Sequence, residues 1–332
     1  MAIGSGLGAS IGVAPESVAY GTYAIPTKFF EFQSEDLKKQ KTTVQGGGLA
    51  AGRFAQLGSR RALTAESGSG SVSMDVPNKG FGLWLQTLMG TTVTPVQQGA
   101  TTAYLQTHAF ADNFGKSLTV QKGVPQTDGT VKPYTFLGCK ATSAEFSCGI
   151  GELLNVKYNL DARQVVENQT LVAPSYATGL GNWDWTDMTL KLGTFGSEAA
   201  VQGVTKVTVN VERGMKTDRQ YAGNAGLKAE PITNDYVKIS GSIDADYLDK
   251  TVFADRFASD APTSLVWTFQ GPLIASTYYY TFKISLPMVF FDGDTPNVSG
   301  PDVVGGSFPF VAQSDGTNPI ATISYTSTDV TL

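Results

Sequence analysis

Few side chains in this sequence are of the types that carry out chemistry. Its 332 residues include one histidine and two cysteines. A histidine needs partner ligands to hold a metal, and His108 has no second histidine and no nearby cysteine. Cys139 and Cys148 are nine residues apart, so on one continuous strand they would point to opposite faces. We therefore expect two reduced, buried thiols, with a disulfide or a shared metal as the alternatives.

The carboxylates suggest little more. Asp244 and Asp246 would share one face of a strand, yet nothing near them indicates a cleft, so a solvated face is expected rather than an acid–base pair. A stretch with Asp292, Asp294 and Asn297 hints at calcium, but Val303 stands where an EF-hand needs its closing glutamate. Phosphate-binding, nucleophile-elbow and zinc-protease motifs are absent. We expect no catalysis, metal or cofactor.

Composition indicates an all-β chain with much surface facing other protein. The chain is 41% hydrophobic and only 16% charged, has 37 glycines, and carries a net charge of −5. This balance argues against a basic surface for nucleic acid. Since no stretch approaches the ~20 apolar residues of a membrane helix, no membrane partner is expected. With two cysteines and no signal-peptide pattern at its start, the product is expected to stay in a cytoplasm until it is assembled.

Several patterns occur twice in the same order. LKKQKTTVQGGGLAAG (37–52) resembles MKTDRQYAGNAGLKAE (215–230), which places Lys38 on Lys216. GSVSMDVPNK (70–79) resembles GSIDADYLDK (241–250), and Ser117-Leu118 with Tyr134-Thr135-Phe136 is echoed by Ser264-Leu265 with Tyr280-Thr281-Phe282. Repeats of this kind predict a duplicated unit. We expect a domain at 27–167, a linker at 168–187 and a second domain at 188–332. Residues 1–26 are expected to form a disordered tail or an arm that lies on a neighbour.

Strict alternation marks one strand in each repeat. In 67–76 and 239–246, apolar residues alternate with small or acidic ones, which is typical of a strand with one buried and one wet face. The wet-face candidates are Ser69, Ser71, Ser73, Asp75, Ser240, Ser242, Asp244 and Asp246. Each strand is expected to lead into a short helix, with Asn78 and Asp249 as N-caps. Further strands are expected at 134–140 and 142–148, among others.

A long polar excursion lies before each of these strands. Loops of more than ~15 residues without a core of their own are usually functional or disordered. Because both repeats keep such an excursion, we expect it to contact other subunits. The candidate contact residues are Leu37, Lys38, Lys39, Lys41, Leu49, Arg53, Arg60, Arg61, Met215, Lys216, Arg219, Leu227 and Lys228.

Several motifs along the chain resemble those of one protein family. They are GVAPESVAYGT (12–22), FEFQSEDL (30–37), GMKTDR (214–219), GLKAEP (226–231), DGDTPNVSGPDVV (292–304) and YTSTD (325–329). With these motifs the chain resembles the major tail tube proteins of long-tailed (siphovirus-type) bacteriophages, especially phages of actinobacteria. The resemblance covers nearly the whole chain.

The resemblance implies a fold and an assembly. It implies β-sandwich or barrel domains, each with one flanking helix, long loops and an N-terminal arm, stacked as rings around a hollow bore in the virion tail. Each domain would give four strands to an inner barrel, so two-domain chains would close a ring from three copies, in place of six single-domain ones. It also implies partners: further copies of the chain, the tape measure protein and genomic DNA in the bore, and tail terminator and tail tip proteins at the ends.

A bore that lets DNA pass should not hold phosphate. Because clustered lysine and arginine bind DNA without sequence preference, a lining of serine and aspartate suits a conduit better. We therefore expect the two wet faces to line the bore. The rival interpretation is an all-β adhesin or carbohydrate-binding module, with Tyr278, Tyr279 and Tyr280 or Trp183 and Trp185 as an aromatic platform.

Overall fold

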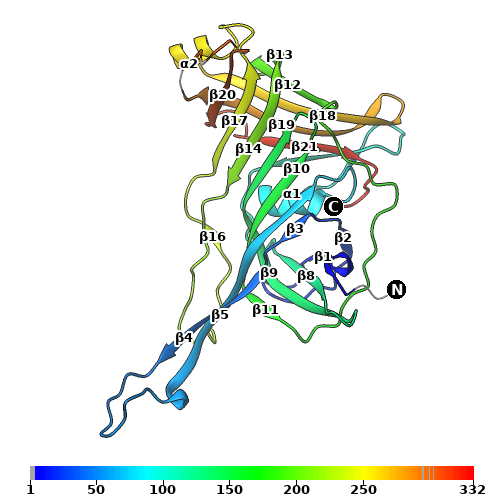
Figure 1. The fold of residues 1–332 in the computed structure, drawn as a ribbon. Coiled ribbons are helices and arrows are strands. Elements are labelled where there is room, and N and C mark those ends of the chain that lie inside the picture. Colours follow the sequence, from blue (N-terminus) through cyan, green and yellow to red (C-terminus); the bar gives the residue numbers. More distant parts are fainter. Residues whose placement is uncertain (1–3, 294, 299, 302) are drawn as a thin grey trace.

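The chain folds into an elongated body of antiparallel strands with one long hairpin projecting from it (Figure 1). This computed structural model describes residues 4–293, 295–298, 300–301 and 303–332. The expected all-β class with two short helices is confirmed. The strands are β1 (Ser10–Pro15), β2 (Lys28–Phe30), β3 (Ser34–Glu35), β4 (Lys38–Gln45), β5 (Arg61–Asp75), β6 (Val96–Gln97), β7 (Tyr104–Ala109), β8 (Leu118–Pro125), β9 (Val131–Gly149), β10 (Asn155–Ala162), β11 (Gln164–Val166), β12 (Met188–Thr194), β13 (Ser197–Ala200), β14 (Val204–Glu212), β15 (Met215–Lys216), β16 (Ile232–Thr233), β17 (Lys238–Asp246), β18 (Thr263–Ala275), β19 (Tyr278–Phe291), β20 (Gly305–Ala312) and β21 (Thr322–Ser327). The helices are α1 (Gly82–Met89) and α2 (Ala254–Ser259), with 3-10 turns at η1 (Gly6–Gly8) and η2 (Gly58–Arg60).

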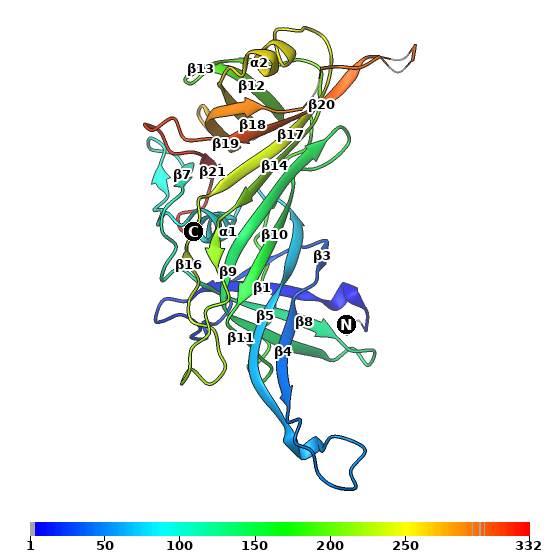
Figure 2. The same ribbon diagram turned by 90° about the vertical axis from the view of Figure 1, so that its left-hand side faces the viewer.

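One sheet runs through the whole body, and we call it the central sheet. Its strands follow the order β4, β5, β10, β9, β14, β17, β20, with every neighbour antiparallel (Figure 2). The two strands expected at 134–140 and 142–148 are a single strand, β9, of 19 residues. Its first part pairs with β8 and its second part with β14, so β9 joins two sheets. The prediction of a break was wrong because a register shift against β10 lets the strand continue.

The two halves repeat one order of elements. The first runs β5, α1, β8, β9, β10 and the second runs β17, α2, β18, β19, β20, with matching antiparallel pairs. Strand register corrects one detail of the sequence comparison. Lys38 lies opposite Ser69 and Asn210 lies opposite Ser240. Lys38 therefore corresponds to Asn210 and not to Lys216, which is six residues further on.

The N-terminal segment belongs to the body of its own chain. Residues Ser10–Pro15 form β1, which pairs with β8 on one side and β2 on the other. Ile11 and Val13 are fully buried. Residues 10–15 are therefore an ordered strand of the chain's own sheet and not a disordered tail.

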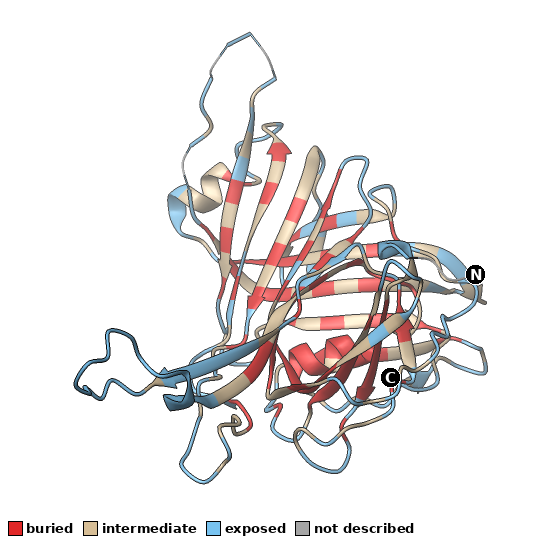
Figure 3. Cartoon of the chain, turned by 60° about the horizontal axis from the view of Figure 1, so that its bottom comes forward, coloured by how far each residue is buried: buried red, intermediate tan, exposed pale blue. Residues whose placement is uncertain are grey.

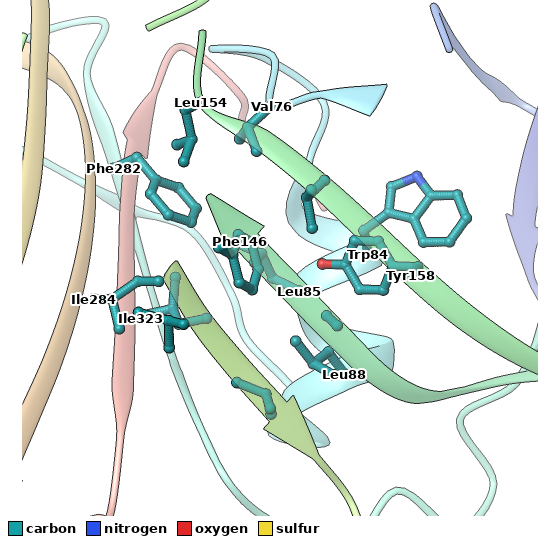
Figure 4. Packing of buried hydrophobic residues seen from close by; sticks show 14 of the residues in the cluster. Val76, Trp84, Leu85, Leu88, Phe146, Leu154, Tyr158, Phe282, Ile284 and Ile323 are labelled. Carbon is teal, nitrogen blue, oxygen red and sulfur yellow. The ribbon is translucent and has the colours of Figure 1, made fainter. Parts of the chain in front are cut away.

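The halves share one hydrophobic core (Figure 4). Phe146 of the first half packs against Phe282 of the second, with ring centroids 5.7 Å apart. Trp183, in the segment expected to be a linker, packs against Phe282 at 5.8 Å and against Tyr325 at 6.1 Å. Because Trp183 is only 1% exposed, it cannot serve as part of an aromatic binding platform.

Neither predicted N-cap residue caps its helix. The Asn78 side chain accepts a hydrogen bond from the Gly181 N–H at 2.9 Å, and Asp249 accepts one from the Thr251 N–H at 2.9 Å. The helices begin several residues later, at Gly82 and Ala254. Asp249 instead stabilises the turn that leads into α2, and Asn78 joins the chain before α1 to the segment at Gly181.

The C-terminus of α1 requires a glycine. Gly90 has a φ of 85°, and a Cβ there would lie 2.2 Å from the Ala111 carbonyl oxygen. A glycine allows this left-handed residue and the close approach of the 90–115 connection. The close approach brings the Ala111 carbonyl next to the end of α1, where it accepts a hydrogen bond from Arg213.

Both cysteines are free, buried thiols. Burial raises the pKa of both, and that of Cys148 to about 12. A thiol in this state carries no nucleophilic thiolate at neutral pH. Cys139 and Cys148 therefore contribute to the core.

His108 makes the folded chain sensitive to acid. Its side chain is fully buried, and burial lowers its pKa from 6.5 to about 4. Below pH 6.5 the unfolded chain binds a proton that the folded chain does not, so stability falls as the pH drops from about 6.5 toward 4. At ~1.4 kcal/mol per pKa unit, this costs about 3 kcal/mol between pH 7 and pH 4.

Urea denaturation at several pH values measures this effect. We expect the His108→Gln variant to lose about 3 kcal/mol less than the wild type over that range, because the glutamine takes up no proton. All other titrating groups are common to the two proteins and cancel in the difference. Parallel pH profiles would show that His108 is not the acid-sensitive group.

Candidate assembly surfaces

One face of the central sheet is polar from β5 to β17. Directly opposed residues point to the same side of a sheet. The pairs that join Asp75 to Asn155, Asn155 to Ser147, Ser147 to Thr208 and Thr208 to Ser242 form one continuous row across five strands. The eight wet-face candidates therefore lie on one face, four on β5 and four on β17. We call it the polar face.

The polar face carries an excess of negative charge. Its carboxylates on these five strands are Asp75, Glu145, Asp161, Glu212, Asp244 and Asp246, and its lysines are Lys140, Lys157, Lys206 and Lys238. Six negative and four positive charges give a net charge of −2. The expectation of a small, neutral-to-acidic surface overlooked these lysines, because they lie outside the two stretches, 67–76 and 239–246, that alternate clearly.

The first excursion is a hairpin formed by β4 and the first part of β5, with residues 46–60 at its tip (Figure 3). We call residues 38–65 the hairpin. Its large apolar side chains are solvent-exposed: Leu49 is 103% and Phe54 is 104% exposed. Large apolar side chains exposed together in this way are typical of surfaces that contact other protein.

The hairpin is also strongly cationic. Residues 38–65 contain six lysines and arginines and no carboxylate, within a chain whose net charge is −5. Lys39 forms ion pairs with Glu66 at 3.3 Å and Glu167 at 3.8 Å at the base. Leu37 is different from the other predicted contact residues: it is only 3% exposed and belongs to the core, so its side chain is not available to a neighbour.

The second excursion, residues 213–237, lies against the first half of the same chain. The Lys228 ammonium contacts the Asp161 carboxylate at 2.5 Å. Asn113 donates to the Met215 sulfur at 3.3 Å, and the Glu66 N–H donates to the Gly226 carbonyl at 3.3 Å. The second excursion was expected to contact other subunits, and in the single chain it contacts the first half of its own chain.

The remaining predicted residues of the second excursion hold its own shape. The Arg219 guanidinium donates to the Glu230 carbonyl at 2.5 Å, and Lys216 pairs with Asp218 at 2.9 Å. Leu227 donates its N–H to the Asn224 carbonyl at 2.9 Å in a turn. These bonds fix the loop that rests on the first half.

A buried ion pair anchors this contact. The Lys140 ammonium lies 2.6 Å from the Glu230 carboxylate, with the two side chains 0% and 9% exposed. The same carboxylate accepts the Gly115 N–H at 2.6 Å, and Lys140 also donates to the Asn113 carbonyl. Burial lowers the pKa of Lys140, and Glu230 partly offsets that shift.

Sequence inspection missed the anchor residues Lys140, Asp161, Arg213 and Glu230. Lys140 and Asp161 lie at the ends of apolar strand segments. The one sequence feature that could have revealed them is a single charged residue beside apolar ones. Burial raises the pKa of Asp161, and Lys228 partly offsets the shift. Charged side chains so well buried require partners, which here come from a segment far away in the sequence.

The central sheet has two edges without a partner strand in the described part of the chain. At one end, β4 pairs only with β5. At the other, Phe290 and Phe291 of β19 pair with β20 on one side only. Inside the chain, the corresponding side of β9 is occupied by β14. Unpaired sheet edges readily add another strand.

Within the described residues, no cluster of three or more histidine, cysteine or acidic side chains could hold a metal ion. Asp294, one of the residues that hint at calcium, lies outside them. No helix in the described part of the chain is both long and apolar enough to span a bilayer.

Comparison with known proteins agrees with this architecture. The model of a family described as phage tail tube protein matches residues 6–312. No curated protein matches the chain. The family match covers nearly the whole sequence, and an exposed hairpin with open sheet edges is what a self-assembling subunit needs. The chain therefore belongs to the phage tail tube protein family and is a structural component of the virion tail.

Proposed function

We propose that three copies of the chain close into one ring and that stacked rings form the tail tube. The observation that carries this is the junction between β9 and β14, where the two halves of one chain join edge to edge. By its pairing, β4 in the first half is equivalent to β14 in the second half, and its outer edge is free in the described part of the chain. The end of β19 is equivalent to β9 and is also free on one side there. The same junction made between copies joins them head to tail, a contact that closes a ring.

Counting the copies in one ring tests this proposal. Native mass spectrometry of rings released from tubes should give three chains, and averaged end-on images should show three repeats of two similar lobes. Six chains per ring, or a monomer under all assembly conditions, contradicts the proposal. Isologous dimers would also contradict it, because the two free edges are different surfaces.

The polar face, in this proposal, lines the bore. Its net negative charge repels phosphate, so genomic DNA and the tape measure protein pass without being held. Tail terminator and tail tip proteins close the two ends of the stack. The chain has no catalytic part in this process, and its role is to form the wall.

Reversing the charge of the polar face should slow DNA passage. We expect the triple change of Asp75, Asp244 and Asp246 to lysine to leave tubes intact, because all three side chains are at least partly exposed. Ejection should become several-fold slower, since each lysine adds a phosphate contact. Dye-labelled DNA release from purified particles measures the rate.

The matched control changes Asp128, Asp249 and Asp315 to lysine. These residues lie in turns outside the central sheet, and the change in net charge is the same. If ejection is unchanged in the polar-face variant, or is slowed equally in the control, the polar face does not line the bore.

A further inference from the structure

Strand register pairs the two excursions residue by residue where they begin. Lys38 corresponds to Asn210, because they lie opposite Ser69 and Ser240 of the repeated strands. Three residues on, Lys41 corresponds to Arg213. Lys41 lies within β4, three residues after its start, and Arg213 directly follows the end of β14.

Arg213 shows what such a cation does. It is 2% exposed and donates to the Leu88 and Ala111 carbonyls, each at 2.7 Å. Leu88 lies in the last turn of α1, where the free carbonyls carry partial negative charge. The start of the second excursion is thus fastened to the end of the helix in the preceding half.

Lys41 has no such partner within the described part of its own chain. Its side chain is exposed and forms no hydrogen bond or ion pair there. The residue that corresponds to Leu88, at equal spacing from the repeated strands, is Ser259 in the last turn of α2. Asp260 follows it, exposed, and adds a full negative charge at the same place.

The two helices differ in burial, as expected if the end of α1 is covered within the chain and the end of α2 is not. Almost every residue of α1 is buried, whereas none of the residues of α2 is. The connection 90–115 and Arg213 together cover the end of α1. Among the described residues, no arginine or lysine side chain bonds to the carbonyls at the end of α2 as Arg213 does to that of Leu88.

The surface beside α2 is apolar, as are some of the exposed side chains of the hairpin. Asp161 lies opposite Lys140, and both receive charged partners from the second excursion. At the corresponding places of the second half, Val311 lies opposite Phe290, and both are half-buried. The hairpin brings exposed apolar side chains and no carboxylate, which matches an apolar surface better than an ionic one.

We propose that the hairpin of one copy docks on the second half of the next copy in the ring. Lys41 approaches the Ser259 carbonyl and the Asp260 carboxylate, and the apolar side chains of the hairpin cover Phe290 and Val311. The occupant of this surface is a second copy of the chain. The inference rests on the proposed ring and specifies which surfaces meet in it.

A charge exchange tests the polar part of this contact. We expect Lys41→Glu and Asp260→Lys each to raise the protein concentration needed for assembly at least tenfold, and the double variant to restore most of the loss. Light scattering across a concentration series measures the threshold, and circular dichroism checks folding. The control Lys132→Glu makes the same charge change at the exposed end of the β8–β9 hairpin.

The outcomes separate this inference from the ring itself. If the wild type forms rings of three and the single variants assemble as well as it does, the docking contact is wrong and the proposed ring still holds. A double variant as defective as the singles also overturns it, because the two charges then do not meet. A wild type that forms no rings contradicts the proposed function instead.

Disulfide trapping locates the contact independently. Tubes of a Lys41→Cys and Asp260→Cys double variant, oxidised and run without reductant, should give covalent products that end at three chains. Lys132→Cys with Asp260→Cys should give none. Absence of cross-links in intact tubes overturns the contact, and products longer than three chains place the hairpin on a different ring.

Discussion

Deletion of residues 40–60 is expected to give a folded protein that no longer forms tubes. The removed segment lies in the exposed hairpin and contributes no side chain to the core. Lys39 still lies opposite Gly68, so residues 61–67 close the shortened turn. Assembly is expected to be lost because the deletion removes the exposed hairpin that the proposed ring uses as a contact surface, and permanent interfaces of this type bury more than ~2,000 Å².

Three measurements check this expectation. The deletion variant should keep the wild-type circular dichroism spectrum and a cooperative urea transition, and light scattering should show monomers at concentrations where the wild type polymerises. A milder control, Leu49→Ser with Phe54→Ser, keeps the hairpin and removes its two most exposed apolar side chains. Tubes formed by the deletion variant would exclude the hairpin as an assembly surface.

Replacing Lys140 with methionine is expected to destabilise the unassembled chain by about 3–5 kcal/mol. The change removes the partner of Glu230 and leaves its carboxylate buried and uncompensated. The energy is lost from the contact between the second excursion and the first half. Urea denaturation of the monomeric deletion variant, with and without the substitution, measures it without interference from assembly.

The paired change of Lys140 to methionine and Glu230 to leucine provides the control. Replacing both members of a buried ion pair with apolar side chains is often nearly neutral, so we expect most of the loss to be recovered. The Gly115 N–H loses its acceptor and retains a cost of ~1 kcal/mol. A single variant within 1 kcal/mol of the wild type would show that the pair does not anchor the excursion.

The sequence predicted strands well where one face is buried. Period-two alternation located β5 and β17, and the polar rows on these strands do lie on one face. Alternation reports burial directly, so it located these two strands. It could not reveal that β9 continues through its register shift, because a bulge disturbs the same period that marks a strand.

The excursions were placed less accurately for a physical reason. Their side chains face solvent or a distant segment, so no periodic pattern fixes their alignment, and the match of Lys38 to Lys216 was six residues off. The Lys140–Glu230 pair was not foreseen because its members are 90 residues apart. Leu37 was misread since one buried leucine among lysines resembles an exposed one.

The junction between β9 and β14 affects how assembly depends on concentration. It forms when a single chain folds, at no cost in the freedom of separate molecules. In the proposed ring of three chains, half of the junctions are made in advance, and the abundance of the ring would follow the third power of the free chain concentration. Six separate single-unit subunits would follow the sixth power, so joining the two halves in one chain would make the dependence of assembly on concentration less steep.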